Sequence, residues 1–334
     1  MNYKLFVGID ISKLTIDVVF ISREQPESFH HRAFKNDYSG FDALLAWLKK
    51  STGTTLQETL FCCEHTGLYV LPVSTYLTAK GFDLWIENPL QIKRSIGLQR
   101  GKSDKADARV IARYALSNQH QVRLYKVPSK TISVIKHLLA FREQLVRHQT
   151  SLKCTSTELK AFDKQNAAIC IAESQYLLQV YEQRIKKVDE QLLREIEADE
   201  QLSKQFKLVQ SVHGIGKQTA FFILIQTQGF TAFTDYRKFA CYCGLAPFPH
   251  TSGTSLRGRN RVSNLANKKL KALLTMCALN TIKKDNEFKR YYERKKAEGK
   301  SFLCILNVIK NKLVSRVFAT VRRGTSYQPD LLSS

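Results

Sequence analysis

Short apolar runs alternate with amphipathic segments over the first 125 residues of the chain. Apolar runs bounded by turn residues predict strands over residues 4–9, 15–22, 28–34, 59–63 and 82–86. Apolar positions at helical spacing predict helices over residues 40–49, 69–80 and 104–116. The chain therefore opens with three successive strands, followed by helix, strand, helix, strand and helix.

This order predicts the fold class of a first domain, residues 1–125. Three strands in direct succession suggest a meander, and the strands that follow alternate with helices. The whole order is the one expected of a ribonuclease H-like (RuvC-like) α/β domain.

A long helical region follows, and we assign it to a linker over residues 126–206. Gly and Pro are absent from Lys130 to Phe206, and apolar residues recur there at a spacing of three and four among charges. This pattern predicts an antiparallel helical hairpin or a coiled coil. We expect it to act as a spacer that carries no chemistry.

The remaining residues, 207–334, predict a mainly helical C-terminal domain. It has Gly-containing turns, a polar loop at residues 246–258 and basic helices that continue to about residue 321. The last residues, 327–334, predict a frayed tail.

The positive net charge indicates what the protein binds. The 334 residues carry 52 Lys and Arg against 29 Asp and Glu, a formal charge of +23, and residues 255–323 hold 19 of these cations against four acids. Basic side chains release counterions when they neutralise the phosphates of a polyanion, so DNA or RNA is the expected partner.

No segment predicts a signal peptide or a membrane span, which favours a cytoplasmic protein. The eight cysteines form no C-x-x-C pair and predict reduced thiols.

Four acids are candidates for a metal site. Asp10 and Glu64 each end a short apolar strand, and Asp104 and Asp107 open a helix one turn apart, on the side expected to face the core. Converging carboxylates repel one another, and a divalent cation such as Mg²⁺ or Mn²⁺ would neutralise them. Two such ions can assist phosphodiester transfer. Alternatively, Asp104 is simply an acid that the helix dipole favours at the start of a helix, and Asp10 is a turn residue after a strand.

A glycine turn is the second candidate site. Gly214 and Gly216 frame an apolar residue, and Lys217 follows at the start of an apolar helix, as in a helix-hairpin-helix. Glycine lets the backbone approach a phosphate, and free amides at a helix start attract an anion. This pattern predicts a nucleic-acid contact, although such a turn can also simply join two helices.

The polar loop contains the third candidate site. Four hydroxyl residues stand close to three arginines, Arg257, Arg259 and Arg261. A serine hydroxyl attacks a phosphodiester when a base or metal accepts its proton and cations stabilise the developing charge. Spacing alone does not choose among the four hydroxyls: Thr251, Ser252, Thr254 and Ser255. His250 is a candidate base, and a polar loop without chemistry is the simpler alternative.

Taken in order, these motifs resemble insertion-sequence transposases of the DEDD type, a family that includes the Piv DNA invertase and the bridge-RNA-guided recombinases. The resemblance runs nearly from end to end. The matching motifs are Gly8-Ile9-Asp10, Glu64 to Tyr69, Asn88-Pro89, Lys102 to Arg109, Gly214-Ile215-Gly216, Gly244 to Pro247 and Ser252-Gly253.

The resemblance implies a RuvC-like domain and a C-terminal transposase domain. The four DEDD acids correspond to Asp10, Glu64, Asp104 and Asp107, and the nucleophilic serine corresponds to Ser252. It further implies a covalent serine–DNA intermediate assisted by metal, and an active site shared between subunits of a dimer or tetramer. A structured noncoding RNA encoded by the element would pair with donor and target DNA.

Three other classes of protein compete with a recombinase. A RuvC-type nuclease or resolvase would use the same acids with water as the nucleophile, and would have no need of Ser252. A sugar-kinase or actin-like ATPase shares the motif that ends at Asp10 but requires a second Gly-rich phosphate loop, which we do not find in the sequence. A nonenzymatic RNA-binding protein would retain binding after the acids are replaced.

Overall fold

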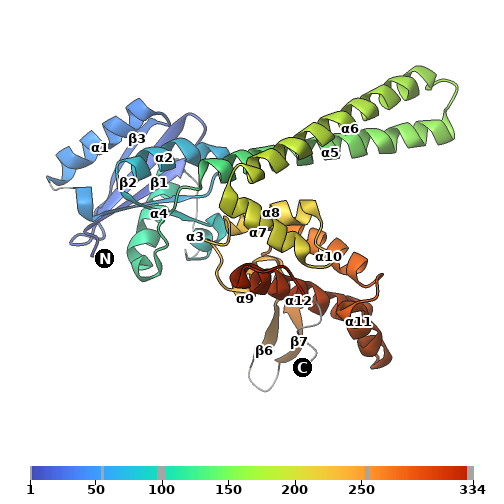
Figure 1. The fold of residues 1–334 in the computed structure, drawn as a ribbon. Helices are drawn as coiled ribbons and strands as arrows, with labels where there is room; N and C mark the ends of the chain where they lie inside the picture. The colour runs from blue at the N-terminus through green and yellow to red at the C-terminus, as the bar shows by residue number, and fades with distance from the viewer. Residues whose placement is uncertain (1, 54–55, 96–102, 253–255, 329–334) are drawn as a thin grey trace. The chain divides into compact units, whose positions relative to one another are not determined.

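The computed structural model describes residues 2–53, 56–95, 103–252 and 256–328 (Figure 1). The chain divides into two compact units, residues 1–127 and 128–334. Within the described residues, no helix is both long and apolar enough to span a membrane.

The first unit is built on a five-stranded mixed sheet with the strand order β3-β2-β1-β4-β5. β1 pairs with β2, and β2 with β3, in antiparallel fashion, while β4 runs parallel to both β1 and β5. The strands are β1 (Leu5–Ile11), β2 (Thr15–Ser22), β3 (His30–Lys35), β4 (Thr59–Glu64) and β5 (Asp83–Glu87). This confirms the predicted α/β order, a meander followed by two parallel strands, as expected of a ribonuclease H-like domain.

Helices cover both faces of this sheet. The helical segments are α1 (Tyr38–Thr52), η1 (Leu56–Glu58), η2 (Gly67–Val70), α2 (Leu71–Ala79), α3 (Pro89–Ser95), α4 (Asp104–Ser117) and η3 (Gln119–Gln121). On β1, Val7 and Ile9 point into a core shared with α1 and α2. Phe6 points to the opposite face, where it packs with Ile111 of α4. Because side chains alternate along a strand, Gly8 and Asp10 also lie on the α4 face.

Gly8 allows α4 to pack directly on β1. A Cβ at this position would lie 2.3 Å from the carbonyl oxygen of Ala108 and 2.3 Å from the amide nitrogen of Ala112. Both atoms belong to the backbone of α4, so they cannot swing aside. The glycine in the Gly8-Ile9-Asp10 motif therefore has a packing role, since it holds the start of α4 close to Asp10.

We expect Gly8→Ala to lower the free energy of unfolding by about 2 to 3 kcal/mol, because the added methyl forces α4 away from the sheet. Urea denaturation of the purified variant measures the loss. Gly216→Ala is the matched control, because a Cβ there would meet nothing within 4 Å. Equal stability of the two variants would contradict the packing role of Gly8.

The second unit begins with two long helices, α5 (Lys130–Phe162) and α6 (Ala168–Glu197), which pack side by side as a hairpin (Figure 1). Arg142 of α5 donates two hydrogen bonds, of 2.6 and 3.1 Å, to the carboxylate of Asp189 on α6. The hairpin confirms the predicted long helices, whereas a coiled coil stays a prediction.

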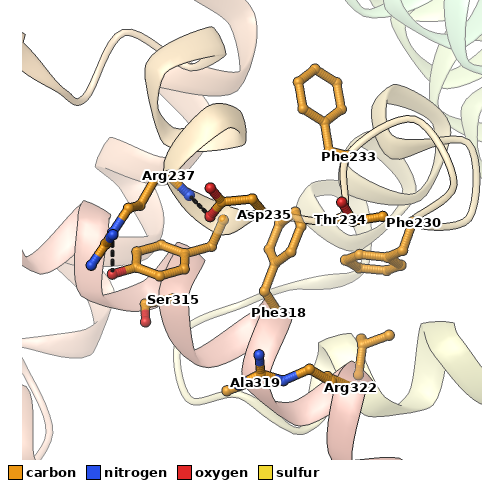
Figure 2. Close-up of a pocket in the computed structure, with 11 residues that line it drawn as sticks. Phe230, Phe233, Thr234, Asp235, Arg237, Ser315, Phe318, Ala319 and Arg322 are labelled. Atoms are coloured by element: carbon orange, nitrogen blue, oxygen red, sulfur yellow. Dashed lines mark hydrogen bonds between the residues drawn. The ribbon is translucent and has the colours of Figure 1, made fainter.

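The C-terminal helices share a hydrophobic core with the base of this hairpin. That core contains Ile135 of α5 and Ile196 of α6 together with Leu274 and Leu313 of the C-terminal helices. The helices are α7 (Glu200–Ser211), α8 (Lys217–Thr227), α9 (Tyr236–Tyr242), α10 (Lys268–Thr281), α11 (Glu287–Ala297) and α12 (Phe302–Arg323). A cavity lies between the segment 230–237 and α12 (Figure 2). The separation of a linker, 126–206, from a transposase domain, 207–334, stays a prediction.

The polar segment 246–258 was predicted as a loop, and this prediction is wrong for most of its length. Residues Pro247–Ser252 form β6, which pairs in antiparallel fashion with β7, Leu256–Val262. A two-stranded hairpin satisfies its own backbone hydrogen bonds, so it forms without the apolar alternation that identifies strands in a larger sheet.

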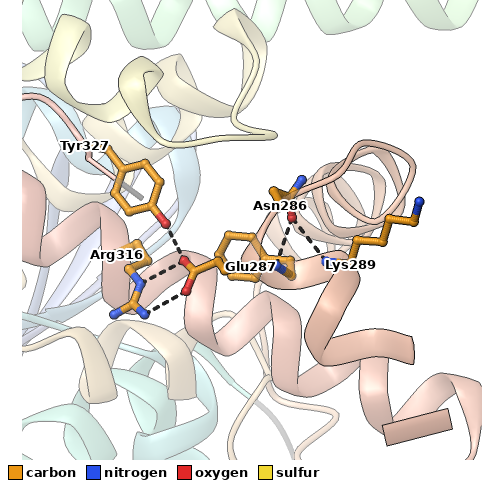
Figure 3. Close-up of polar contacts among 6 residues, drawn as sticks. Asn286, Glu287, Lys289, Arg316 and Tyr327 are labelled. Atoms are coloured by element: carbon orange, nitrogen blue, oxygen red, sulfur yellow. Dashed lines mark hydrogen bonds and ion pairs between the residues drawn. The ribbon is translucent and has the colours of Figure 1, made fainter. Parts of the chain in front are cut away.

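The frayed tail predicted over residues 327–334 is also wrong at its first residue. Tyr327 is buried, and its hydroxyl donates a hydrogen bond to Glu287 at the start of α11 (Figure 3). Arg316 of α12 donates to the two oxygens of the same carboxylate at 3.3 and 3.2 Å. The amide of Tyr327 also donates to the hydroxyl of Ser211, at 2.8 Å. This network fastens the end of the chain to α7, α11 and α12.

The Glu287 network predicts a pH-dependent contribution to stability. Burial alone would raise the pKa of Glu287, but the hydrogen bonds from Arg316 and Tyr327 outweigh it and hold the pKa below its usual value. The contribution is therefore present above about pH 4.5 and is lost as the pH falls further. We expect Glu287→Gln to lower the free energy of unfolding by about 1 to 2 kcal/mol at pH 7.

Urea denaturation at pH 7 and at pH 3.5 measures this effect, and the difference between parent and variant should shrink at the lower pH. Glu293→Gln is the control on the same helix, because Glu293 forms only an exposed ion pair with Lys289, 3.9 Å apart. A difference that is the same at both pH values would show that the carboxylate charge does not stabilise this network.

Candidate active site

Two of the predicted acids lie at the carboxyl ends of neighbouring parallel strands, Asp10 one residue before the end of β1 and Glu64 at the end of β4. Gly8 lies opposite Cys62, and Ile9 opposite Cys63, in the register of β1 and β4. Asp10 and Glu64 are the next residues on each strand, so they lie side by side at the carboxyl edge of the sheet. Leu60 and Cys62 share the α4 face, which places Glu64 on the same face as Asp10.

The other two acids open α4, but only one of them faces inward. The hydroxyl of Ser103 caps this helix by accepting a hydrogen bond from the amide of Ala106, at 3.2 Å. Asp107 is half-buried, next to the buried Ala108 that packs on Gly8. Asp104 is exposed, so the prediction that it lies on the core-facing side is wrong. As the first residue of the helix, Asp104 precedes the stripe that contacts the sheet.

Burial and nearby acids together raise the pKa of Asp10. Burial is the main reason that the pKa of the Asp10 carboxyl rises to about 6, and nearby carboxylates raise it further: Glu64, Asp107, Asp104 and Asp17. A carboxylate that senses several like charges is stabilised by any cation that joins them. Acids from β1, β4 and α4 therefore lie close enough together for their charges to interact.

Asp17 is an acid of this site that the sequence analysis missed. It lies directly opposite Asp10 in the antiparallel pair of β1 and β2. Its carboxylate is 2.6 Å from Nε2 of His31, which comes from β3. The available signal was a charged residue within an otherwise apolar strand, the same signal that singled out Asp10.

Glu87 ends β5 opposite Glu64 and was also missed. Its carboxylate accepts hydrogen bonds from the Tyr114 hydroxyl, at 3.3 Å, and from the Asn88 amide, at 2.6 Å. Glu87 thereby connects the end of the sheet to α4 and to the start of α3, which the Asn88-Pro89 motif forms.

The chemistry of the donor set fits a hard divalent cation. Carboxylate oxygens are the ligands that Mg²⁺ and Mn²⁺ prefer, and several carboxylates lie close enough to Asp10 to raise its pKa beyond the effect of burial. Among the residues that the structure describes, however, no group of three or more His, Cys, Asp or Glu side chains is arranged to hold a metal ion.

The raised pKa of Asp10 predicts that its charge destabilises the fold. The protonated form is favoured in the folded protein, so this group contributes stability below about pH 3.8 and loses it as the pH rises through about 6. A shift of this size corresponds to about 3 kcal/mol, which solvent screening of the half-buried carboxyl reduces to about 1 to 2 kcal/mol. In chelator, Asp10→Asn should therefore be more stable than the parent at pH 7.5.

Thermal unfolding at pH 7.5 and at pH 4 measures this gain, which should be absent at pH 4. The control is Glu24→Gln, an exposed acid just beyond the end of β2. An Asn variant that is no more stable than the parent at pH 7.5 would contradict the repulsion.

The predicted serine lies on the hairpin of the second unit. Ser252 is the last residue of β6 and pairs with Leu256, while Thr251 pairs with Arg257. Arg257, Arg259 and Arg261 all lie on β7, and Arg261 is exposed. The structure therefore brings the serine and the arginines onto one hairpin. Two other candidate hydroxyls, Thr254 and Ser255, lie outside the described residues.

The glycine turn joins α7 to α8. Gly214 has a φ of +86°, and a Cβ there would lie 1.8 Å from the Thr281 hydroxyl of α10. A packing requirement therefore explains glycine at this position. Gly216 caps α8 and is open to solvent, as is Lys217. Contact of this turn with nucleic acid stays a prediction.

A sheet of ribonuclease H-like order with carboxylates at its edge, followed by a basic helical unit, is typical of enzymes that act on polynucleotide phosphodiesters. Comparison with known families is more specific. A family model described as transposase matches residues 7–159, and a model described as transposase IS116/IS110/IS902 family matches residues 206–293. The chain belongs to this family of insertion-sequence transposases, so the resemblance is confirmed and DNA strand transfer is the activity that the family implies.

Two proteins that are similar in sequence agree with this assignment. The pilin gene-inverting protein of Moraxella bovis is 26% identical over 330 residues, which cover 97% of this chain and 98% of that protein. An insertion element IS110 protein of Streptomyces coelicolor is 32% identical over 118 residues, 35% of this chain and 29% of that protein. The solved structure of T. thermophilus RuvC in complex with Holliday junction substrate aligns with 37% of this chain and 100% of its own, at 12% identity and a TM-score of 0.28.

Proposed function

We propose that the protein cleaves and rejoins DNA strands through a covalent serine–DNA intermediate at Ser252, assisted by Mg²⁺ or Mn²⁺ at Asp10, Glu64, Asp104 and Asp107. The observation that carries this proposal is the register of β1 and β4, which puts Asp10 beside Glu64 at the edge of the sheet, where a divalent cation would offset their mutual repulsion. The metal would supply charge neutralisation at the scissile phosphate.

In the proposed reaction, the Ser252 hydroxyl attacks phosphorus and loses its proton. One P–O bond of the DNA breaks, one forms to the serine oxygen, and the departing strand end takes up a proton. Since one phosphoester replaces another, rejoining needs no nucleotide hydrolysis. Arg257, Arg259 and Arg261, on the strand that pairs with β6, would stabilise the negative charge on the phosphate.

The reaction needs groups from both units of the chain, and we propose that they meet between subunits of a dimer or tetramer. The support is an exposed set of apolar side chains toward the far end of the α5–α6 hairpin. Phe162 is 88% exposed and Ile169 is 79% exposed, and both flank the turn between the two helices. Large apolar side chains at this exposure favour contact with a second copy.

The proposed partners are donor and target DNA and a structured noncoding guide RNA. The net charge of +23 supports nucleic acid as the partner. Similarity to pilin gene-inverting proteins over nearly the whole chain supports DNA recombination as the outcome.

The test is direct detection of the covalent intermediate. Purified protein is incubated with Mg²⁺, DNA that spans the ends of the element and RNA transcribed from its noncoding flank, and is then separated on a denaturing gel. A protein–DNA adduct that resists boiling in detergent is the expected result.

The alternative function is a RuvC-type nuclease or resolvase, which the carboxylate edge alone would serve. That enzyme would cut branched DNA in Mg²⁺ without forming an adduct. Cleavage products with free ends, and no adduct at any time point, would favour the nuclease.

A further inference from the structure

A cavity of about 520 Å³ opens in the second unit between the segment before α9 and one face of α12 (Figure 2). Aromatic side chains form its walls: Phe230 and Phe233 come from the segment after α8, Tyr236 from α9, and Phe318 from α12. A cavity of this size accommodates a nucleobase with its sugar. None of these residues belongs to the candidate active site described above.

Phe230 adopts an unfavourable backbone conformation. Its φ is +64°, and the two preceding residues, Gln228 and Gly229, also have positive φ values of +49° and +62°. A bulky residue in the left-handed region costs free energy, so the surrounding contacts must hold it there. Its amide donates to the Thr227 hydroxyl at 3.2 Å, and its ring packs edge-on against Phe318, with 5.1 Å between centroids.

Two exposed arginines, Arg237 and Arg322, line the cavity beside the aromatic side chains. Nε of Arg237 donates a hydrogen bond to the Tyr236 hydroxyl, at 3.4 Å, and the guanidinium lies over the Tyr236 ring, 5.7 Å from its centroid. The one acid of the lining, Asp235, accepts a hydrogen bond from the backbone amide of Arg237, at 2.9 Å, and so caps α9. Aromatic walls beside exposed guanidinium groups match the two surfaces of a nucleotide, an apolar base and an anionic phosphate.

A second cavity, of about 460 Å³, continues along α12 toward the hairpin that carries Ser252. It shares Tyr236, Arg237 and Ser315 with the first cavity, and it is also lined by Lys312 and by Pro247, the first residue of β6. A single strand that enters the first cavity with one base would therefore pass Arg237 and Lys312 before it reaches the base of the β6–β7 hairpin.

We infer that the cavity lined by Phe230, Tyr236 and Phe318 binds one unpaired nucleotide of a nucleic-acid partner, with its base packed against this aromatic wall and its phosphate on Arg237 and Arg322. This inference rests on the proposed function only in that the partner is a nucleic acid. An unpaired base is required because a base inside a duplex presents only its edges, whereas an extruded base presents its face to an aromatic ring. The unpaired nucleotide comes either from a bulge or loop of structured RNA or from a DNA strand opened during recombination.

The experiment compares two 20-base-pair duplexes that differ by a single unpaired 2-aminopurine nucleotide at the centre. Each is made once as RNA and once as DNA, and affinity is measured by fluorescence anisotropy at fixed salt. We expect the full-length protein to bind the bulged duplex roughly tenfold more tightly than the paired duplex. The emission of 2-aminopurine should fall on binding, because stacking quenches it. Preference in the RNA pair identifies a guide-RNA nucleotide, and preference in the DNA pair identifies an opened strand.

Two variants test the cavity itself. Arg237→Ala removes a lining cation, and Lys238→Ala is its matched control, because Lys238 is the adjacent exposed cation of α9 but does not line the cavity. Ala319→Trp fills the cavity from α12 without changing the charge. We expect Arg237→Ala and Ala319→Trp to lose the preference for the bulge and the quenching, and Lys238→Ala to keep both.

Other results overturn the inference. Equal affinity of the parent for bulged and paired duplexes would eliminate the nucleotide site while leaving nucleic-acid binding intact. Equal losses for Arg237→Ala and Lys238→Ala, with Ala319→Trp unaffected, would reduce the effect to general charge. If the protein binds neither duplex, the nucleic-acid partner itself is wrong, and the proposed function fails together with this inference.

Discussion

Replacing Asp10 or Asp107 with asparagine should reduce DNA strand exchange by at least roughly 10²- to 10³-fold, while the protein remains folded. Each substitution keeps the shape of the side chain and removes one negative charge from the cluster formed by Asp10 and its neighbouring carboxylates. Without that charge the group binds a divalent cation less tightly, so neutralisation at the scissile phosphate is lost. Recombination of a plasmid that carries donor and target sites measures the rate.

The stability of the same variants separates catalysis from folding. Asp10→Asn should unfold at a temperature no lower than the parent, and added Mg²⁺ should raise the unfolding temperature of the parent more than that of the variant. Glu24→Gln, an exposed neutralisation in the same unit, should change neither activity nor the response to metal. Parental rates for both Asp10→Asn and Asp107→Asn would rule out the metal site.

The sequence was sufficient to predict the central part of the first unit. β1 and β4 are short apolar runs with an acid at or next to their last residue, and their parallel pairing puts Asp10 beside Glu64 without further information. Strand alternation then decides which face each acid occupies, because Phe6 and Leu60 mark the face that α4 covers. Local pattern and global fold agree here, so prediction from sequence works.

Prediction failed where contacts distant in sequence decide the structure. Asp17 is an exception, because β2 directly follows β1 and the charged residue in its apolar strand was an available signal. Tyr327 is buried because Glu287 and Ser211, 40 and 116 residues away, accept hydrogen bonds from its hydroxyl and its amide. Pairing partners of this kind leave no periodic pattern in their own segment. The β6–β7 hairpin was missed for a related reason: its strands contain Gly, Pro and charged residues, and backbone hydrogen bonds hold them together.

The position of Asp104 was predicted wrongly for a geometric reason. The helical spacing of Asp104 and Asp107 is correct, but the first residue of a helix lies beyond the turn that contacts the sheet, so Asp104 is exposed. The packing role of Gly8 was not predicted at all, and it follows from the steric clash that a Cβ there would make with the backbone of Ala108 and Ala112. Neither fact is visible in the sequence without the packing of α4 on β1.

Ser252→Ala should abolish the covalent protein–DNA adduct and reduce strand exchange by at least roughly a thousandfold, because it removes the proposed nucleophile. Nucleic-acid affinity should stay within about twofold of the parent, since the substitution changes no charge. Thr251→Val is the matched control on the same strand, because it removes a neighbouring hydroxyl at nearly constant size. An adduct formed by Ser252→Ala protein would assign the nucleophile to another residue.

Mixing the two inactive variants tests whether the site is shared between subunits. Ser252→Ala retains the carboxylates of the first unit, and Asp10→Asn retains the serine of the second unit, so a mixed oligomer contains some sites in which both parts are intact. We expect equal mixtures to regain a measurable fraction of parental strand exchange, which neither variant shows alone. The adduct should then form only on the Asp10→Asn chain, which a size tag on one variant reveals on the denaturing gel. If mixed oligomers form but stay inactive, each subunit must supply both Ser252 and Asp10 to its own site.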